Sequence, residues 1–564
     1  KYQEMGSARA SPESSREGRV PPRPKLTLKW GKVELAPPAS KRNEHSLWSR
    51  LGFLLTWLNG VEHKADIAVV GGGFGGALMA MVARRLGRSV VLIERGTHPR
   101  FAIGESSTPL ASLLLQQLAE EHDLPQLLPF RRWGEWQREH PGIGCGLKRG
   151  FSFFHHTLGQ SFSDDEQRRN QLLVAASPRD EVADTHWFRA DFDHHLVNEA
   201  QRLGVEYFDR TELTSFDEQP DGVTLGGRRN GGPVRFHAGF VIDATGPRGW
   251  LHRTLGLANR ELPLMPVTSG LFAHFKNVGA WPSEEGAPYP VESAAVHHVF
   301  DGGWVWVLKF NNGITSAGVA ATGERAAELG LAEGALGWQR LLAKLPTLAK
   351  QFAAAEPVGG FVFAPELSFC SGQITGARWA LLPSSAGFVD PLLSTGFPLT
   401  LLGIKRLAKL LRGEPSTSAL AGYERRTVAE LGQASRLVGA LYASMGDFEL
   451  FAALTQVYFA AVSFSETAHR LGKPELAESF LLCEHPEFGP ATREICESVV
   501  RLAKRDELLA KIRDVIEPFN VAGLADPAKR NWYPVATGDL FAAAAKLGSS
   551  ADKIREMLLR EQLL

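Results

Sequence analysis

The sequence predicts an α/β protein in which a nucleotide-binding domain carries an inserted β-sheet domain and a helical C-terminal region. Three observations predict this class. A short apolar run at 66–70 ends in a glycine-rich turn and is followed by a helical and then a strand pattern. From about 262 to 380 the pattern changes to short alternating strands. From about Phe397 onward most segments have helical periodicity.

The chain of 564 residues is long enough for more than one domain. We predict a disordered tail over residues 1–45, because this segment is rich in Ser, Pro, Arg and Glu and shows no sustained periodicity. Ordered structure is then expected to begin near Ser46. We predict a discontinuous nucleotide-binding domain over 46–261 and 376–412, a β-sheet substrate domain over 262–375 and a helical C-terminal region over 413–564.

Local patterns predict the individual elements. A strand at 66–70, a helix at 77–86 and a strand at 89–93 form a βαβ unit, with buried parallel strands at its core. A further helix is predicted at 191–203, a strand opening at Val205, and a short buried strand at 240–242. The inserted domain is predicted to contain strands at 294–300, 303–310 and 316–320.

Composition excludes several function classes. Lys and Arg together number 62, as do Asp and Glu, so no global field favours nucleic acid or an anionic membrane. No apolar run reaches the roughly 20 residues of a membrane span, and the longest candidate, at 451–464, is interrupted by polar residues and predicts a buried helix. The four cysteines form no C-x-x-C pair, which favours a reducing compartment, and we expect a cytoplasmic protein.

The turn at 71–76 fits the dinucleotide-binding pattern G-x-G-x-x-G. Gly71 permits the tight turn, Gly73 leaves room for a diphosphate, and Gly76 allows close packing of the helix on the strand. The helix N-terminus offers free N–H groups and a positive dipole end to the phosphates. Glu94 ends the second strand, where a carboxylate binds an adenosine ribose and disfavours a 2′-phosphate, so FAD or NAD is preferred over NADP. The other candidate contacts in this segment are Phe74, Gly75 and Arg95.

The histidine pairs and two C-terminal segments are further candidates for a functional role. Histidine pairs stand at 155–156, 194–195 and 297–298, but none has a recognised metal-ligand spacing, so we predict no metal site. The segments 520–527 and 530–534 combine polar and aromatic residues. We interpret them as a well-packed loop, with a lining of the substrate pocket as the alternative.

Three further segments favour FAD by resemblance. Residues 98–109 (HPRFAIGESSTP) look like the P-R-x-x-I-G-E-S-x-x-P segment of flavin-dependent halogenases and their monooxygenase relatives. Residues 241–247 (VIDATGP) and 385–396 (SAGFVDPLLSTG) are similar to the D-A-[ST]-G and A-G-F-x-[DE]-P-x-x-S-[ST]-G segments of that superfamily. The resemblance runs from about Asp66 to about Gly403 and implies a flavin-monooxygenase fold with FAD as cofactor. It implies cofactor contacts from Glu105, Ser106, Asp243, Thr245, Gly246, Gly387, Phe388, Asp390 and Pro391.

Other matches concern the chemistry. Lys148, within GLKRGFSF at 146–153, looks like the halogenase segment that carries the active lysine, and Trp304 and Trp306 resemble the tryptophans of the W-x-W-x-I-P motif. In the family, backbone N–H groups around Thr395 and Gly396 can hold halide. The resemblance implies a two-component halogenase that uses reduced FAD, O2 and halide on an electron-rich aromatic, free or carrier-bound. A separate reductase would supply the reduced flavin, since no second glycine fingerprint for a pyridine nucleotide is present.

Alternatives remain open for these residues. Lys148 could instead be a solvated surface lysine. Trp304 and Trp306 could instead be a packed aromatic pair in the core, since alternation places both side chains on one face of a strand.

The chain also departs from the family pattern at several positions. Leu308 and Lys309 replace Ile-Pro, and residues 383–384 (Pro-Ser) replace the Gly-Asp of the wider superfamily. Leu393 stands where tryptophan halogenases carry a catalytic Glu. An apolar residue at this position is closer to the phenol and pyrrole halogenases. Two other functions therefore remain: an FAD monooxygenase or dehydrogenase, or a flavin-binding accessory protein that docks a partner through its helical region.

Overall fold

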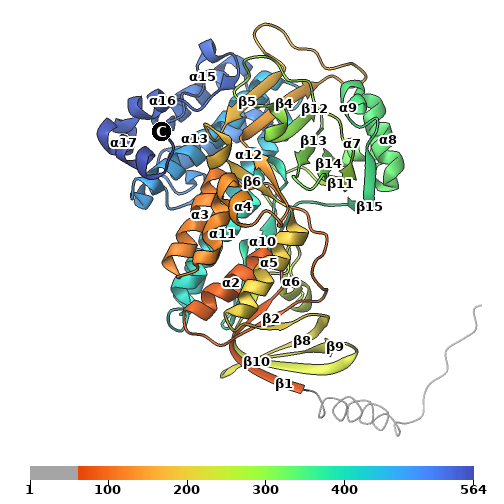
Figure 1. Ribbon diagram of the computed structural model, residues 1–564, viewed down its shortest axis with the longest axis vertical. Coiled ribbons are helices and arrows are strands. Elements are labelled where there is room, and N and C mark those ends of the chain that lie inside the picture. Colours follow the sequence, from red (N-terminus) through yellow and green to blue (C-terminus); the bar gives the residue numbers. More distant parts are fainter. Residues whose placement is uncertain (1–60) are drawn as a thin grey trace, which may run out of the picture. The chain divides into compact units, whose positions relative to one another are not determined.

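The computed structural model describes residues 61–564. The predicted tail at 1–45 and the predicted start of order near Ser46 lie outside these residues. Within them, two large sheets and a group of C-terminal helices make up the chain, and Figure 1 shows their arrangement.

The first sheet holds the predicted βαβ unit. Its strand order is β7-β2-β1-β10-β9-β8, with β17 also beside β10. β1, β2 and β10 run parallel, and residues 67–70 of β1 are buried, as expected for a central strand with both faces covered. The predicted strands at 66–70, 89–93 and 240–242 and the helix at 77–86 are confirmed. The elements are β1 (Val61–Val70), α2 (Phe74–Arg85), β2 (Val90–Ile93), α5 (Arg189–Arg202), β7 (Glu206–Phe208), β8 (Thr211–Gln219), β9 (Gly222–Arg229), β10 (Gly232–Asp243), α6 (Trp250–Thr254) and β17 (Trp379–Leu381).

The second sheet has eight strands in the order β15-β11-β14-β13-β12-β4-β5-β19. It extends beyond the predicted segment 262–375, because β4 and β5 come from before it and β19 from near the C-terminus. β4 pairs in parallel with β12, which supplies the hydrogen bonds that the edge of the local meander would otherwise lack. The strands are β4 (Gly150–His156), β5 (Gln171–Ala175), β11 (Thr268–Lys276), β12 (Ala295–Phe300), β13 (Gly303–Lys309), β14 (Thr315–Thr322), β15 (Glu356–Ala364) and β19 (Trp532–Tyr533).

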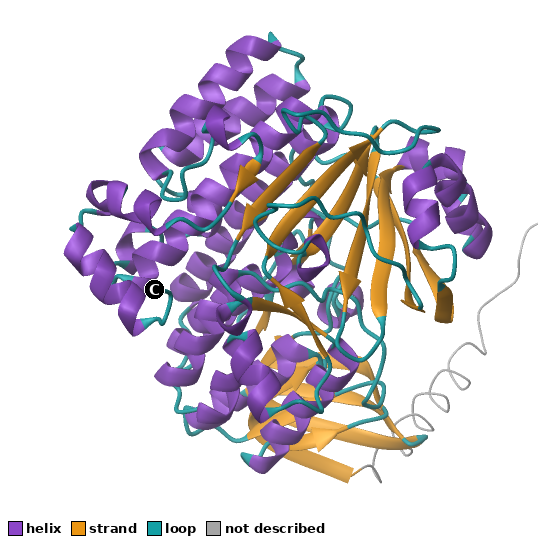
Figure 2. Ribbon diagram, turned by 45° about the horizontal axis from the view of Figure 1, so that its top comes forward, coloured by secondary structure: helices purple, strands orange, loops and turns teal. Residues whose placement is uncertain are grey.

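Helices cover both faces of this sheet (Figure 2). One face packs on α7 (Gly323–Leu329), α8 (Ala335–Lys344) and α9 (Pro346–Gln351), three helices that the strand pattern of 262–375 did not predict. The side chains of β13 alternate between two hydrophobic clusters, with Trp304 and Trp306 in the larger cluster and Val305 and Val307 in the smaller. The two tryptophans therefore lie on one face of the strand, as predicted.

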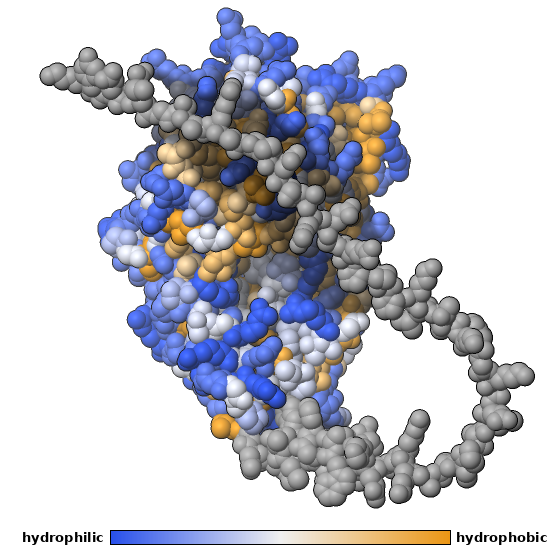
Figure 3. All heavy atoms as spheres, turned by 90° about the vertical axis from the view of Figure 1, so that its right-hand side faces the viewer, coloured by the Kyte–Doolittle hydropathy of each residue, from blue (hydrophilic) through white to orange (hydrophobic). Residues whose placement is uncertain are grey.

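A side view shows how polarity divides between the sheets. In Figure 3 hydrophobic residues gather over the half that holds the eight-stranded sheet, and the other half is more hydrophilic. On β15, Val358 and Val362 are among the exposed large hydrophobic residues.

The chain after residue 396 is largely helical, as predicted. α13 is the one helix among residues 61–564 that is long and apolar enough to cross a membrane, and 78% of its apolar window is buried inside the protein, as in a core helix. The helices are α11 (Gly396–Leu410), α12 (Thr417–Ser444), α13 (Phe448–Arg470), α14 (Phe488–Val500), α15 (Arg505–Ile516), α16 (Thr537–Ala542) and α17 (Ala551–Arg560).

Small elements connect the two sheets. β3 (Cys145–Lys148) pairs antiparallel with β6 (Asp184–Trp187), and this ladder places Lys148 opposite Asp184. β16 (Phe369–Cys370) pairs with β18 (Gly387–Phe388). The remaining helices are α3 (Pro109–Glu121), the 3₁₀ helix η1 (Pro125–Arg131), α4 (Trp133–Glu139) and α10 (Pro383–Ala386).

The C-terminal aromatic segment packs as a strand. Trp532 donates a hydrogen bond from its indole nitrogen to Gln171 over 3.2 Å, and the Tyr533 hydroxyl accepts one from Gln456 over 3.2 Å. Both rings are buried. The packing interpretation of this segment is therefore supported over a lining of the substrate pocket.

Candidate active site

The glycine-rich turn connects β1 to α2. Gly71 has a φ of +105°, and a Cβ there would lie 2.5 Å from the carbonyl oxygen of Ala244. A Cβ on Gly76 would collide with the Gly71 carbonyl oxygen. At Gly73 the nearest atom to such a Cβ is Nη2 of Arg189 at 3.6 Å. Gly71 and Gly76 are therefore required by the fold, whereas Gly73 keeps open the space in front of the helix N-terminus.

Glu94 lies directly after β2, beside this turn. Its carboxylate accepts hydrogen bonds from the backbone amides of Gly72 and Gly96, both at 2.8 Å, and lies 3.3 Å from Nη2 of Arg100. Burial acts to raise the pKa of Glu94, but Arg100 and the two amides outweigh it and lower the pKa overall. The side chain is thus held as a carboxylate at the position predicted to bind the adenosine ribose. Arg95 is exposed at the end of the strand.

Sequence patterns missed an arginine at the same turn. Arg189 opens α5, forms a bidentate ion pair with Asp193 at 2.7 Å and donates to the Gly104 carbonyl at 2.9 Å. Its guanidinium lies 4.9 Å from the Phe74 ring centroid. A buried cation beside a helix N-terminus suits a diphosphate. The spacing of Arg189 and Asp193, four residues apart at a helix start, was the only signal in the sequence.

Polar atoms without partners mark the same crevice. Among the described residues, Nε2 of His98, Nε of Arg100 and Oε2 of Glu105 are buried without a hydrogen-bond partner. His98 and Arg100 lie beside the glycine turn, where a Cβ on Gly72 or Gly73 would meet them at 3.1 and 3.8 Å. Buried polar groups are normally paired, so the two unpaired nitrogens fit a site built for a polar ligand such as FAD.

Glu105 and Ser106 face protein partners. Glu105 is buried, and its Oε1 lies 2.8 Å from Nε2 of His274 on β11. The Ser106 hydroxyl accepts a hydrogen bond from Nζ of Lys148 over 2.8 Å. The segment predicted to contact the cofactor therefore also reaches the candidate catalytic lysine.

The carboxylate of Asp243 is held within its own turn. Both of its carboxylate oxygens are used by its own turn: Oδ1 accepts from the Thr245 amide at 2.9 Å, and Oδ2 accepts from the Leu251 amide at 2.6 Å. The side chain is fully buried and shapes the turn that carries Thr245 and Gly246, and its contact with the cofactor stays a prediction. The Gly246 amide donates to the Ser385 hydroxyl at 3.0 Å, which joins this turn to the 385–396 segment.

Asp390 is the polar centre of that segment. Its Oδ1 accepts from the Trp304 indole at 3.2 Å and from the Leu392 amide at 3.0 Å, and its Oδ2 accepts from the Tyr442 hydroxyl at 3.0 Å. Burial raises the pKa of Asp390 to about 7. Neighbouring Gly387 and Phe388 form β18 and Pro391 begins the turn that follows. Asp390 thus fixes the motif to β13 and α12 from inside the protein, and its contact with the cofactor stays a prediction.

The turn after Asp390 has an unusual backbone. Leu393 and Ser394 have φ values of +66° and +55°, a region that non-glycine residues rarely adopt. This turn delivers Thr395 and Gly396 to the N-terminus of α11, where Gly396 is exposed and a Cβ would meet nothing within 4 Å. α11 has 15 residues, and the N-terminus of a helix of this length attracts an anion, as the predicted halide position requires.

The helix N-termini of α2 and α11 meet. The ring centroids of Phe74 and Phe397 are 4.8 Å apart, and Phe397 also stacks on Trp187 of β6 at 4.3 Å. The predicted phosphate turn and the predicted halide position therefore lie at the N-termini of two neighbouring helices, and each N-terminus is the positive end of its helix dipole.

Lys148 is fully buried, so the alternative of a solvated surface lysine is wrong. Its Nζ donates to the Ser107 carbonyl at 2.5 Å and to Ser106, and lies 3.8 Å from the Phe151 ring centroid. Burial lowers the pKa of Lys148, and the nearby Asp184 carboxyl offsets part of that effect. Burial raises the pKa of Asp184 in turn. A neutral amine is thus accessible near neutral pH.

Rings connect Lys148 to Asp390. Phe151 stacks on His297 at 5.8 Å between centroids, and His297 lies 5.3 Å from Trp304. Burial lowers the pKa of His297 to about 3, so this ring is neutral. Trp306 lies 5.6 Å from Trp304 and donates to Ser316 at 3.3 Å. Both tryptophans are buried, and Trp304 has in addition the polar contacts that link it to the 385–396 segment.

Among residues 61–564 the structure contains no cluster of three or more His, Cys, Asp or Glu side chains arranged to hold a metal ion. Two of the histidine pairs meet in the eight-stranded sheet, where Nε2 of His156 lies 3.1 Å from Nδ1 of His298.

Comparison with known proteins places this geometry in a family. A family model described as FAD dependent oxidoreductase matches residues 66–354, just over half of the chain. The chain belongs to the FAD-dependent oxidoreductases. It is therefore an enzyme with FAD as its cofactor, and the alternative of a flavin-binding accessory protein is set aside.

Similar proteins within this family are flavin-dependent halogenases, which confirms the predicted resemblance. Monodechloroaminopyrrolnitrin halogenase PrnC of Pseudomonas fluorescens is 28% identical over 416 residues, covering 70% of this chain and 71% of that protein. Tetracycline 7-halogenase of Kitasatospora aureofaciens is 26% identical over 420 residues, covering 71% and 74%. The structure of halogenase PltM in complex with phloroglucinol and FAD matches with a TM-score of 0.72 at 25% identity, covering 83% of this chain and 99% of that one. The mixed α/β fold of this FAD-dependent oxidoreductase is thus that of flavin halogenases.

Proposed function

We propose that this FAD-dependent oxidoreductase is a flavin-dependent halogenase of an electron-rich aromatic substrate, free or bound to a carrier, with a separate flavin reductase. The observation that carries the proposal is Lys148: a fully buried lysine, held by Ser106 and Ser107 and linked through rings to the segment that ends at α11. We also propose a cytoplasmic location, which the four free cysteines support.

The residues present suit FAD. Gly73 leaves the diphosphate position open, Arg189 supplies a cation there, and Glu94 is held as a carboxylate for the ribose. The amides at Thr395 and Gly396 would hold halide at the N-terminus of α11. When bound, reduced FAD supplies hypohalous acid from O2 and halide.

Lys148 then passes the halogen to the substrate. As a neutral amine it attacks hypohalous acid, so that an N–halogen bond forms and water leaves; the aromatic carbon next takes the halogen, the amine is restored and the ring proton is lost. As an ammonium ion it donates a hydrogen bond to the oxygen of hypohalous acid and orients it toward the ring. Its lowered pKa keeps both forms accessible near neutral pH.

The alternative of an FAD monooxygenase or dehydrogenase is favoured mainly by Leu308 and Lys309, which replace the Ile-Pro of the halogenase motif. Lys309 forms an ion pair with Glu292 at 2.7 Å and is part-exposed, and Leu308 is a buried core residue. This departure from the halogenase motif therefore concerns the end of β13 and leaves Lys148 and the α11 segment unaltered.

The test is product analysis by mass spectrometry. The chain is incubated with FAD, a flavin reductase, NADH, O2 and bromide or chloride, with phloroglucinol and a pyrrole as probe arenes. A product with the isotope pattern of the added halide supports the proposal. A hydroxylated or desaturated product that forms without halide selects the monooxygenase or dehydrogenase alternative.

The separate reductase has its own test. FAD-loaded protein is mixed with NADH or NADPH under anaerobic conditions, and the visible absorbance of oxidised flavin is followed. We expect no bleaching until a reductase is added. Rapid bleaching by the chain alone would mean that it accepts hydride itself.

A further inference from the structure

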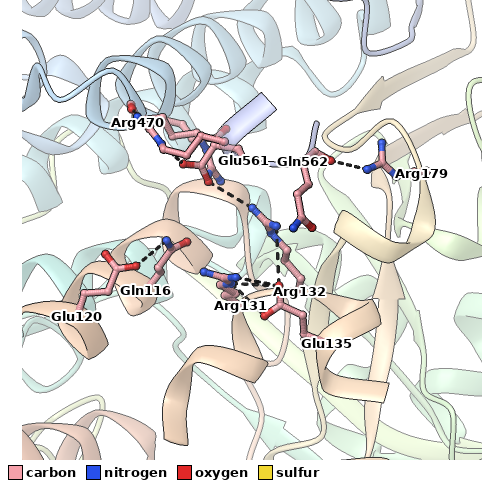
Figure 4. Close-up of polar contacts among 11 residues, drawn as sticks. Gln116, Glu120, Arg131, Arg132, Glu135, Arg179, Arg470, Glu561 and Gln562 are labelled. Atoms are coloured by element: carbon pink, nitrogen blue, oxygen red, sulfur yellow. Dashed lines mark hydrogen bonds and ion pairs between the residues drawn. The ribbon is translucent and has the colours of Figure 1, made fainter. Parts of the chain in front are cut away.

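An arginine-lined cavity of about 390 Å³ lies between α3, η1, α13 and the C-terminal end of α17. None of its residues belongs to the segments that predict the FAD or halide positions. Figure 4 shows several of its side chains turned toward one another from segments far apart in the chain. The charged groups of its lining are Arg131, Arg132, Arg470 and Arg560, with Glu120 and Glu561.

A single carboxylate from the C-terminal end of the chain fills the meeting point of three arginines. Oε2 of Glu561 lies 2.7 Å from Nη1 of Arg470 and 3.3 Å from Nη2 of Arg132, and its Oε1 lies 3.1 Å from Nε of Arg560. Glu561 follows the last residue of α17, and its side chain is buried. Three converging guanidinium groups are the arrangement that recognises a carboxylate or phosphate.

A smaller cavity of about 40 Å³ adjoins the first one. It shares Arg131, Arg132 and Arg470 with the first cavity and reaches Asp184. Oδ2 of Asp184 is buried and has no hydrogen-bond partner among the described residues, so an acceptor is left open at the inner end. Asp184 is the ladder partner of Lys148 between β6 and β3. The smaller cavity therefore ends one strand away from the candidate catalytic lysine.

We propose that this cavity binds the oxyanion group, a carboxylate or phosphate, of the aromatic substrate, and that Glu561 occupies the site until the substrate replaces it. The proposal rests on the halogenase function above and adds the substrate class to it. Arg132, Arg470 and Arg560, which now hold Glu561, then hold the oxyanion, and Arg131 adds a fourth positive charge to the lining. Asp184 accepts a hydrogen bond from a hydroxyl or N–H group of the substrate. The aromatic ring then lies between the arginines and Lys148.

The arginines differ in how much they depend on Glu561. Arg131 is paired with Glu135 through Nε at 3.0 Å and Nη2 at 2.9 Å and does not contact Glu561. Arg470 is also paired with Glu466 at 2.8 Å. These second carboxylates keep both guanidinium groups in place when Glu561 leaves, so the site persists without its internal occupant. Replacing Arg131 should therefore lower the affinity for the oxyanion without disturbing Glu561.

The experiment is a binding titration by calorimetry on the FAD-loaded chain, without halide or reductant. The probes are benzoate, phenyl phosphate and uncharged benzyl alcohol. We expect one or both anions to bind at least about tenfold more tightly than benzyl alcohol, and the tighter anion identifies the group as carboxylate or phosphate. Glu561→Gln should raise anion affinity about tenfold, and Arg131→Gln should lower it about tenfold. The matched control is Arg138→Gln, since Arg138 lies on α4, is exposed and pairs with Glu139 outside the cavity.

A second measurement does not depend on the Glu561 variant. Hydrogen exchange of amides in the last turn of α17 should become faster when the anion is added to the unaltered chain, because the anion displaces Glu561. Equal binding of benzyl alcohol and the anions, or equal effects of Arg131→Gln and Arg138→Gln, would overturn the proposal. Anion binding in a chain that forms no halogenated product would contradict the halogenase function and support this site. Halogenation that anions neither require nor inhibit would overturn this site alone.

Discussion

The indole nitrogen of Trp304 lies 3.2 Å from the carboxylate of Asp390 and donates a hydrogen bond to it. Trp304 belongs to the eight-stranded sheet, and Asp390 belongs to the segment that leads into α11. The contact therefore fixes the sheet that carries the tryptophans to the turn that presents Thr395 and Gly396. Because both side chains are buried, the pair is a structural link as well as part of the candidate site.

Trp304→Phe removes this link while keeping an aromatic ring. We expect halogenated product to fall more than about tenfold, because small displacements of positioned groups have effects of that size. Stability should fall by about 1–2 kcal/mol, since Asp390 loses a buried donor. Trp306→Phe is the parallel variant: it also replaces an indole by a smaller ring, but it loses a hydrogen bond to Ser316 instead of the link to Asp390. If both variants give unchanged yield, the tryptophans are core residues alone.

Asp390→Asn tests the raised pKa of that carboxyl. Between the unfolded pKa of about 3.9 and the folded pKa of about 7, the folded chain keeps a proton that the unfolded chain has lost, so stability falls as the pH rises through this window. The variant has no such loss. Urea unfolding should show its stability relative to the unaltered chain rising by about 3 kcal/mol from pH 5 to pH 8.

The control for that experiment is Asp552→Asn, an exposed residue paired with Arg555. It should show a constant difference over the same range. A constant difference for Asp390→Asn as well would mean that Asp390 ionises normally in the folded protein.

Gly73→Ala should weaken FAD binding without damage to the fold. A Cβ at this position meets no atom closer than 3.6 Å in the protein, but it projects into the space assigned to the diphosphate. We expect FAD affinity to fall at least about tenfold, or about 1.4 kcal/mol, in a fluorescence titration. Gly76→Ala gives the contrast, because its Cβ collides with the Gly71 carbonyl and should cost more than about 2 kcal/mol of stability. FAD binding unchanged in Gly73→Ala would contradict the assignment.

Lys148→Met tests the burial of the amine. Between its lowered folded pKa and its ordinary unfolded pKa, the unfolded chain binds a proton that the folded chain does not, so this group makes stability rise with pH. The variant lacks that rise. We therefore expect it to be more stable than the unaltered chain near pH 7 and to lose this advantage toward pH 10, in urea unfolding followed by circular dichroism. An advantage that does not change with pH would mean that Lys148 stays charged in the folded state.

The local fold could be predicted where one segment contains its own signal. The βαβ unit at 66–93 has an apolar strand, a turn with positions where only glycine fits, and a helix, all within thirty residues. The eight-stranded sheet was predicted only in part, since nothing in the apolar runs of β4, β5 and β19 indicates which sheet they join. Pairing is decided by strands far apart in the chain.

The candidate site divides in the same way. Lys148, Trp304 and Asp390 were found through motifs, but their burial and contacts were not predictable from them. Asp184 was missed because it meets Lys148 only through a two-stranded ladder, and Arg189 because a single arginine at a helix start is a common pattern. For Asp243 the motif likewise does not show that both carboxylate oxygens accept hydrogen bonds from its own turn.

The role of Lys148 in halogen transfer is tested by comparing Lys148→Met with Lys309→Met in the halogenation assay, using the same FAD, reductase and bromide. Lys309 is a lysine of the neighbouring strand β13 with a part-exposed ion pair to Glu292, so it controls for the substitution itself. We expect Lys148→Met to retain the visible spectrum of bound FAD and to lose at least about 100-fold of its brominated product, while Lys309→Met keeps its activity. Brominated product at an unaltered rate in Lys148→Met would contradict the central role of this lysine.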